Sequence, residues 1–126
     1  MGRMTKCLTI AVGAAEVSKK LAPNEDWKDK WQHGYVGCVL RQQRCCKRVT
    51  HAIAVGKELA TELQKGTKPS KWDIEATMFG WKKGLWGARW KWIWFGFILV
   101  KKSPKEICDH FRDRWEVLMN LEDTAS

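Results

Sequence analysis

The chain lacks the long apolar segment that a membrane-spanning helix requires, since none of its apolar runs approaches about 18–20 uninterrupted residues. With ten glycines and three prolines among 126 residues, it also lacks the composition of a low-complexity chain. Its hydrophobic fraction of 44% excludes a disordered protein. Gly-rich phosphate loops, nucleophile elbows and H-E-x-x-H motifs are missing too, which argues against the common NTPase and hydrolase classes.

Cysteine pairs with the C-x2-C spacing of zinc sites are absent as well. Five cysteines occur, at positions 7, 38, 45, 46 and 108. An odd number is a poor disulfide framework, and the adjacent Cys45 and Cys46 cannot easily bridge each other. We therefore expect reduced, partly buried thiols. A zinc site formed by Cys38, Cys45, Cys46 and His51 is the alternative.

The length of 126 residues suits a single domain spanning residues 1–126. Capping residues and helical periodicity divide it into helix-sized pieces, and we predict an all-α fold of about five to six helices. The expected helices cover about residues 5–21, a second that begins after Asn24, a third after Thr50, a fourth from Ser70 to about Lys83, and a last one over 103–120 that begins at Ser103-Pro104.

The conformation of residues 85–100 is the open question of this fold. Trp90, Trp92 and Trp94 alternate as in a strand, whereas Trp86, Trp90 and Trp94 repeat every four residues as in a helix. A lone strand would have no visible partner elsewhere in the chain. We therefore favour a helix for this segment.

Positive charge is concentrated in parts of the chain rather than spread evenly over its formal net charge of +9. Residues 81–102 contain no acidic residue. Their candidate contact residues are Trp81, Lys82, Lys83, Trp86, Arg89, Trp90, Lys91, Trp92, Trp94, Lys101 and Lys102. A second basic patch consists of Arg41, Arg44, Lys47 and Arg48. These two stretches predict an anionic partner.

Two partners suit basic residues that alternate with tryptophan. At an anionic membrane surface, Trp settles at the water–lipid interface while Lys and Arg reach the headgroups. On a nucleic acid, the basic side chains bind phosphates and the indole rings stack on unpaired bases. We expect the membrane surface first, with a cytoplasmic or membrane-peripheral location, and nucleic acid second. Burial of most tryptophans in the core is the third interpretation.

A set of polar residues forms a candidate catalytic or metal site. His33 follows Asp29 by one helical turn, and Glu58 and Glu62 are also one turn apart. Asp73 begins the next predicted helix. If these helices pack around one centre, His33, Glu58 and Asp73 are the candidate catalytic residues. Together with Glu62 they are candidate ligands of a divalent metal, which would make the chain a metal-dependent enzyme or toxin. The alternative is that they only pair with each other across helix contacts.

Residues 29–80 combine D-K-x-x-H, then G-K-E, then W-x-D-I-x-A-x-x-x-G. This order resembles small bacterial membrane-associated proteins of VanZ-like and lipoprotein type, and the C-terminal segments of Rhs-type polymorphic toxins. The stretch 33–38 is similar to the H-C-x-x-S-C variant of the toxin segments, although Gly34 stands where the variant has a cysteine. The resemblance implies a bacterial or phage-related helical protein at a membrane, with His33, Glu58 and Asp73 as its functional polar residues.

Overall fold

A computed structural model of the chain describes residues 2–66 and 70–125, which form six helices and one two-stranded sheet. The elements are α1 (Arg3–Leu21), α2 (Lys28–Gln42), α3 (Lys47–Lys65), α4 (Lys71–Lys82), β1 (Arg89–Ile93), β2 (Gly96–Val100), α5 (Pro104–His110) and α6 (Arg112–Ala125). The predicted all-α class with five to six helices is confirmed in all but the hairpin. None of the helices in this described part is both long and apolar enough to cross a bilayer.

One hydrophobic core receives residues from all six helices. Trp31 of α2 and Trp115 of α6 are its largest fully buried aromatic side chains. Both rings are buried, and both indole N–H groups still donate a hydrogen bond. Trp31 donates to the carboxylate of Asp109 at 3.0 Å, and Trp115 donates to the carbonyl of Cys108 at 2.8 Å. The core therefore explains two of the nine tryptophans completely.

Helix α2 lies at the centre and packs most extensively on α4. The two backbones touch because glycine occupies the contact positions. A Cβ at Gly37 would lie 1.9 Å from the carbonyl oxygen of Thr77, and one at Gly80 would lie 2.0 Å from that of Gly34. This close approach brings the first turns of α2 and α4 together, where the candidate polar residues lie.

Two helix starts confirm the capping predictions, and two correct them. Ser70 and Ser103 cap α4 and α5 by accepting from the backbone N–H groups of Asp73 and Glu106. Asn24 does not cap α2, which begins four residues later after a turn. Thr50 does not cap α3 either, because the helix begins at Lys47 and buries the Thr50 side chain inside its first turns. The expected last helix is interrupted at Phe111, which separates α5 from α6.

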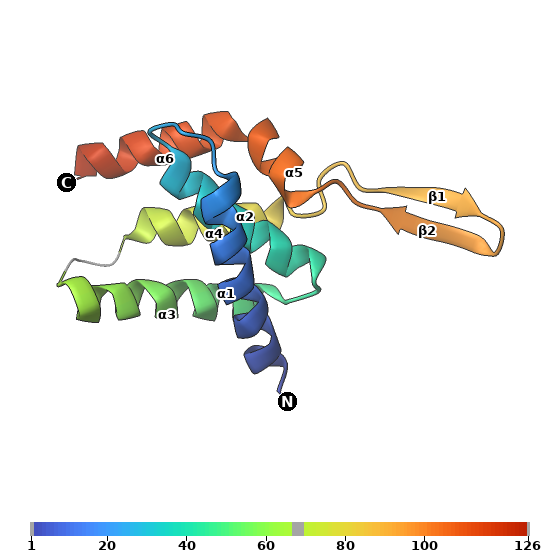
Figure 1. The fold of residues 1–126 in the computed structure, drawn as a ribbon, viewed down its shortest axis with the longest axis horizontal. Helices are drawn as coiled ribbons and strands as arrows, with labels where there is room; N and C mark the ends of the chain where they lie inside the picture. The colour runs from blue at the N-terminus through green and yellow to red at the C-terminus, as the bar shows by residue number, and fades with distance from the viewer. Residues whose placement is uncertain (1, 67–69, 126) are drawn as a thin grey trace.

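The helix favoured for residues 85–100 is wrong: the segment forms an antiparallel hairpin that projects away from the helices (Figure 1). The strand Arg89–Trp92 pairs with Phe97–Val100, the apolar end of the same segment. The aromatic and β-branched residues favour extended backbone. Gly96 supports the reversal with a φ of 143°, which other residues rarely adopt.

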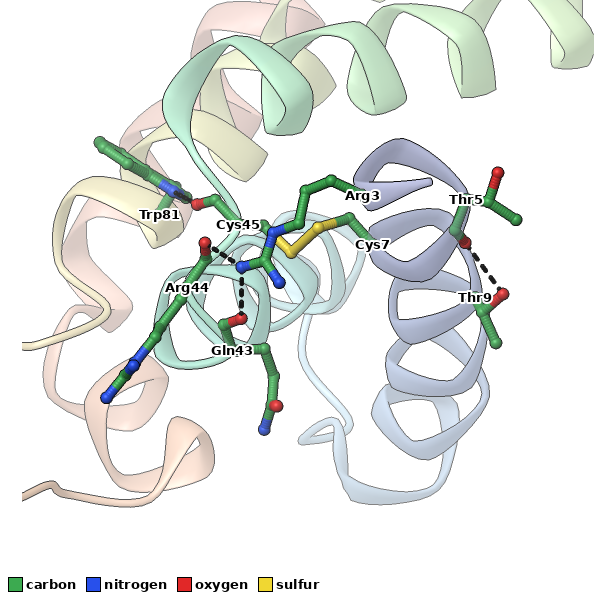
Figure 2. The surroundings of a disulfide bond; sticks show 8 residues. All are labelled: Arg3, Thr5, Cys7, Thr9, Gln43, Arg44, Cys45 and Trp81. Carbon is green, nitrogen blue, oxygen red and sulfur yellow. Dashed lines mark hydrogen bonds between the residues drawn. A yellow bond between two sulfur atoms is a disulfide. The ribbon is translucent and has the colours of Figure 1, made fainter. Parts of the chain in front are cut away.

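The prediction of reduced thiols is wrong for two cysteines, because Cys7 and Cys45 form a disulfide. Figure 2 shows this bond joining α1 to the segment between α2 and α3. The same segment is held by the guanidinium of Arg3, which donates to the carbonyls of Gln43 and Arg44. This bond excludes the four-residue zinc site that includes Cys45, because the sulfur of Cys45 is already bonded to that of Cys7. The free thiols of Cys38 and Cys108 are buried, as expected.

Candidate functional site

The candidate polar site lies where α2, α4 and α6 meet. Asp29, Lys30 and His33 come from the first turns of α2, Asp73 from the first turn of α4, and Glu122 from the end of α6. The Asp29 and His33 side chains share one face because they are four residues apart. Tertiary packing adds the carboxylates of the other two helices.

Lys30 is the centre of the site and is fully buried. Its Nζ donates to Oδ1 of Asp73 at 2.6 Å, to Oδ2 of Asp29 at 3.2 Å, and to a carboxylate oxygen of Glu122. Burial by itself lowers the pKa of Lys30, but the hydrogen bonds to Asp73 and Glu122 and the negative charges of Asp73 and Asp29 raise it above its usual value. The ammonium therefore stays charged, and it orients three carboxylates.

His33 lies on the opposite side of these carboxylates. Its Nε2 is 3.5 Å from Oδ2 of Asp73 and 3.6 Å from Oδ1 of Asp29. Burial, followed by the positive charge of Lys57, lowers the pKa of His33 to about 4, although Asp29 acts in the opposite direction. At pH 7 the imidazole is neutral, so these contacts are polar contacts rather than ion pairs.

The two aspartates have pKa values moved in opposite directions. Burial and the charges of Asp29 and Glu58 raise the pKa of Asp73 to about 7, against the hydrogen bond and charge of Lys30. Burial also acts to raise the pKa of Asp29, but His33 in its protonated form and the charge and hydrogen bond of Lys30 outweigh it and leave that pKa below its usual value. Paired carboxyls that differ in this way can divide the roles of proton donor and charged partner.

The side chains of the two aspartates and His33 can together hold a metal ion. One ligand atom each from Asp29, His33 and Asp73 lies within 4.8 Å of the other two. Each aspartate gives one oxygen to Lys30 and turns the other toward His33, so the donor set is one imidazole nitrogen and two carboxylate oxygens. Zn²⁺ and other first-row divalent metals accept this set. The positive charge of Lys30 next to the site opposes a cation and limits affinity.

The structure brings together His33 and Asp73 of the predicted site, but not Glu58. Glu58 is buried and accepts from the backbone N–H of Ser70 at 3.1 Å, so it holds the start of α4 and influences Asp73 through its charge. The side chain of Glu62 lies outside the described part of the chain. Sequence reasoning placed Asp29 on the same face as His33 but did not count it among the ligands, and it left Lys30 and Glu122 out of the site. No sequence signal links these two residues, because they are 92 positions apart.

The tryptophan-rich segment divides into packed and exposed parts. Trp81 is half-buried, donates to the carbonyl of Cys45 at 2.8 Å, and lies under the guanidinium of Arg41. Trp86 stacks on His110 with ring centroids 3.9 Å apart. Lys83 and Lys102 are half-buried next to aromatic rings. The half-buried rings of Trp81 and Trp86 thus pack on the helical body, and their contact with a partner stays a prediction.

The hairpin carries the exposed part of this segment. Cross-strand partners share a face, so Trp90, Trp92, Phe97 and Leu99 form one wholly apolar side. Trp92 and Phe97 touch edge to face, with centroids 5.1 Å apart. The tip consists of Trp94 and Phe95, whose exposed fractions are 91% and 94%. We call these two residues the hairpin tip.

The basic patch lies at the base of the hairpin rather than apart from it. Arg41, Arg44 and Lys101 line a hollow of about 380 Å³ together with Trp90 and Ile98 of the strands. Lys101 also donates to the carbonyl of Gln42 at 3.2 Å, which ties the end of the hairpin to α2. Lys47 and Arg48 are exposed at the start of α3. The fold thus joins part of the basic patch and the hairpin into one surface.

Comparisons of the chain with protein-family models, curated proteins and solved structures find no match.

Proposed function

We propose that the protein docks on an anionic membrane surface through its β1–β2 hairpin, as a membrane-peripheral protein. The observation that carries this proposal is the hairpin tip, where two aromatic side chains are almost completely exposed at the end of a projecting element. An exposed apolar patch of this kind is typical of a surface that meets a partner. Indole rings prefer the interface of a bilayer, which accepts the ring and leaves its N–H hydrated.

The charge at the base of the hairpin selects the kind of membrane. Arg89, Lys91 and Lys101 are exposed in a stretch without acidic residues, and Arg41 and Arg44 lie next to it. Basic side chains near an anionic bilayer each contribute about 1 kcal/mol. A hairpin inserted at its tip would bring these cations to the headgroups. The proposal includes a bacterial or phage origin, which rests on the resemblance of residues 29–80 alone.

A double substitution of the tip tests this proposal. We expect the intact protein to co-sediment with vesicles that contain phosphatidylserine and to bind vesicles of phosphatidylcholine alone more weakly. Trp94→Ser with Phe95→Ser should abolish co-sedimentation. Leu63→Ser is the matched control, because Leu63 of α3 is 87% exposed but lies far from the tip along the chain.

Nucleic acid is the alternative outcome of the same measurement. Binding to vesicles through inserted aromatic residues should persist at moderate salt, whereas binding to the phosphates of a nucleic acid weakens steeply as salt rises. Equal sedimentation of the tip variant and the Leu63→Ser control, or a salt-sensitive complex with single-stranded DNA that excludes vesicles, would contradict membrane docking.

A second function is favoured by the convergence of Asp29, His33 and Asp73: binding of a divalent metal. Titration calorimetry with Zn²⁺ and Mn²⁺ should show one saturable site, and His33→Gln or Asp73→Asn should remove it. Glu58→Gln is the control, because it keeps the acceptor for Ser70 and lies outside the three-residue set. Unchanged binding in His33→Gln would show that the metal is held elsewhere, and an absence of binding would refute the site.

A further inference from the structure

The hollow at the base of the hairpin is lined by three cations. They are Arg41, Arg44 and Lys101, and no acidic residue of the described chain lines it with them. No ion pair among the described residues engages these cations, whereas the neighbouring Lys102 pairs with Glu106 at 3.6 Å. The volume of about 380 Å³ is within the range of about 300–1,000 Å³ that is typical of small-molecule sites. We call it the basic hollow, and its charge favours an anion.

Two of the three cations are held in place and still have donors to offer. The ammonium of Lys101 gives one of its three N–H groups to the carbonyl of Gln42 at 3.2 Å, which leaves two. The guanidinium of Arg41 lies over the ring of Trp81, 4.2 Å from its centroid, and a ring brings no net charge to neutralise it. A Cβ at Gly84 would lie 2.5 Å from that of Arg41, so the stem of Arg41 packs on bare backbone.

Arg44 has a backbone conformation that does not suit an arginine. Its φ is 64°, and it comes directly after Gln43, the C-cap of α2, where helices usually place glycine. The guanidinium of Arg3 and the Cys7–Cys45 disulfide hold this segment. Within the described chain the Arg44 side chain forms neither a hydrogen bond nor an ion pair. A strained residue whose side chain serves no internal contact is typical of a functional position.

The other wall of the basic hollow is apolar. It includes Trp90 and Ile98 of the strands. Trp90 also begins the apolar side of the hairpin, which runs through Trp92 toward the hairpin tip. At about 3.3 Å per residue, the tip lies roughly 13 Å beyond Trp90, which exceeds the depth of about 5–8 Å of a headgroup layer. A lipid phosphate in the hollow is therefore compatible with a tip that reaches the acyl chains.

We propose that the basic hollow binds the terminal phosphate of a phosphomonoester lipid, such as phosphatidate. The proposal rests on the membrane docking proposed above and names the lipid at that surface. A phosphomonoester carries a charge of about −1.5 to −2 and three strong acceptor oxygens, which three cations can match. The ammonium groups of phosphatidylserine and phosphatidylcholine find no acidic partner in the lining.

Titration calorimetry with soluble ligands tests the site without a membrane. The ligands are dihexanoyl phosphatidate and dihexanoyl phosphatidylserine, each below its critical micelle concentration, and glycerol 3-phosphate. We expect one site per chain that binds the phosphatidate at least about tenfold tighter than the other two. Equal affinity for the two lipids would overturn the preference for a phosphomonoester. Equal affinity for glycerol 3-phosphate would overturn a lipid as the ligand, because the apolar wall would then contribute nothing.

Two arginine substitutions form a matched pair. Arg44→Gln removes one charge from the hollow and should weaken phosphatidate binding about tenfold or more, the range of a charged hydrogen bond. Arg112→Gln removes the same charge from an exposed position on α6, outside the lining, and should bind normally. Equal binding by the two variants would overturn the hollow as the site.

A glycine variant separates binding from stability. Arg44→Gly relieves the left-handed backbone, so we expect it to lose phosphatidate affinity while its melting temperature stays the same or rises. A lower melting temperature would overturn the assignment of Arg44, because its side chain would then serve the fold.

The tip variant distinguishes this site from membrane docking. The protein with Trp94→Ser and Phe95→Ser should bind dihexanoyl phosphatidate normally although it no longer sediments with vesicles; loss of the soluble lipid would overturn the hollow as the site. An unmodified protein that sediments with phosphatidylserine vesicles but does not bind dihexanoyl phosphatidate would overturn the phosphate site and leave docking by the tip in place. Displacement of the bound lipid by an equal concentration of single-stranded DNA would overturn it in favour of nucleic acid.

Discussion

Lys30 places a full positive charge inside the protein, and its surroundings show what a buried charge requires. Three carboxylates on three helices accept from its ammonium, so that every direction in which it donates ends on an oxygen. A buried charge with good partners adds little net stability, but removal of one partner leaves the others uncompensated. Lys30 is therefore a single residue on which the packing of α2, α4 and α6 depends.

The substitution Lys30→Met tests this dependence. It keeps a long, unbranched side chain and leaves Asp29, Asp73 and Glu122 without their shared cation, so we expect a loss of about 3–5 kcal/mol in the free energy of unfolding. Lys19→Met is the control, because it breaks an exposed pair with Glu16 and should cost less than about 1 kcal/mol. Urea denaturation measures both, and similar losses for the two variants would contradict the central role of Lys30.

His33 and Asp73 predict opposite responses to pH in metal-free buffer. The pKa of His33 is lowered to about 4, so the unfolded chain binds its proton first and stability falls as pH drops from 6.5 toward 4. The pKa of Asp73 is raised to about 7, so the folded state binds its proton first and stability rises as pH drops from 7 toward 4. In the intact protein these two effects partly cancel.

Removal of the histidine should separate the two effects. We expect His33→Gln to gain stability relative to the unmodified protein as pH falls from 6.5 to 4, because only the unmodified protein pays the cost of keeping a neutral imidazole. Urea unfolding midpoints of both proteins at half-unit pH steps measure the difference. Parallel curves over this range would show that His33 titrates alike in the folded and unfolded states.

At the scale of elements, the crossing of α2 and α4 decides where the polar residues meet. The glycines at the crossing let the two backbones touch, and only at this separation do Asp73 and His33 come within 3.5 Å. A larger residue in place of one of these glycines would separate α2 from α4 and so disturb the polar site without touching it. The sequence shows the glycines, but it does not show that they face one another.

Gly37→Ala should therefore destabilise the fold despite the better helix propensity of alanine. Its Cβ would lie 1.9 Å from the backbone oxygen of Thr77, which cannot move without α4, and overpacking of this kind costs about 1–3 kcal/mol. Gly13→Ala meets open space and should stabilise by up to about 1 kcal/mol. Thermal melts compare the two; stabilisation by both would contradict the close crossing.

Strand β1 of the hairpin finds its partner, β2, within the same short segment of the chain. The run of apolar residues from Trp92 to Val100 matches neither a helical nor a strand period, and no segment elsewhere in the sequence offers a strand partner. The partner follows after a two-residue turn in the same run. An isolated two-stranded hairpin is only marginally stable in water. The exposed apolar face of this hairpin therefore favours a role in binding.

At the scale of the whole molecule, the Cys7–Cys45 disulfide connects the first helix to the centre of the fold. It closes a loop between residues 38 positions apart, and chain-entropy reasoning assigns such a bond about 4 kcal/mol. It also holds α1 against α2, on which this helix packs.

Removal of this bond by Cys7→Ala with Cys45→Ala should lower the free energy of unfolding by about 4 kcal/mol. Reduction of the unmodified protein should have a similar effect, and a reductant should leave the melting temperature of the double variant unchanged. Thermal melts with and without reductant measure all three. An unmodified protein that melts alike in both conditions would show that the bond contributes no stability.

The sequence by itself determined the helical class, the caps at Ser70 and Ser103, and the shared face of Asp29 and His33. Each of these depends on residues within one or two helical turns, where spacing and capping chemistry act directly. Only the tertiary structure decided that Glu122 reaches Lys30, that Cys7 meets Cys45, and that Arg41 lies beside the hairpin. These contacts join residues tens of positions apart, and they arise because backbone packing, not local pattern, brings distant segments together.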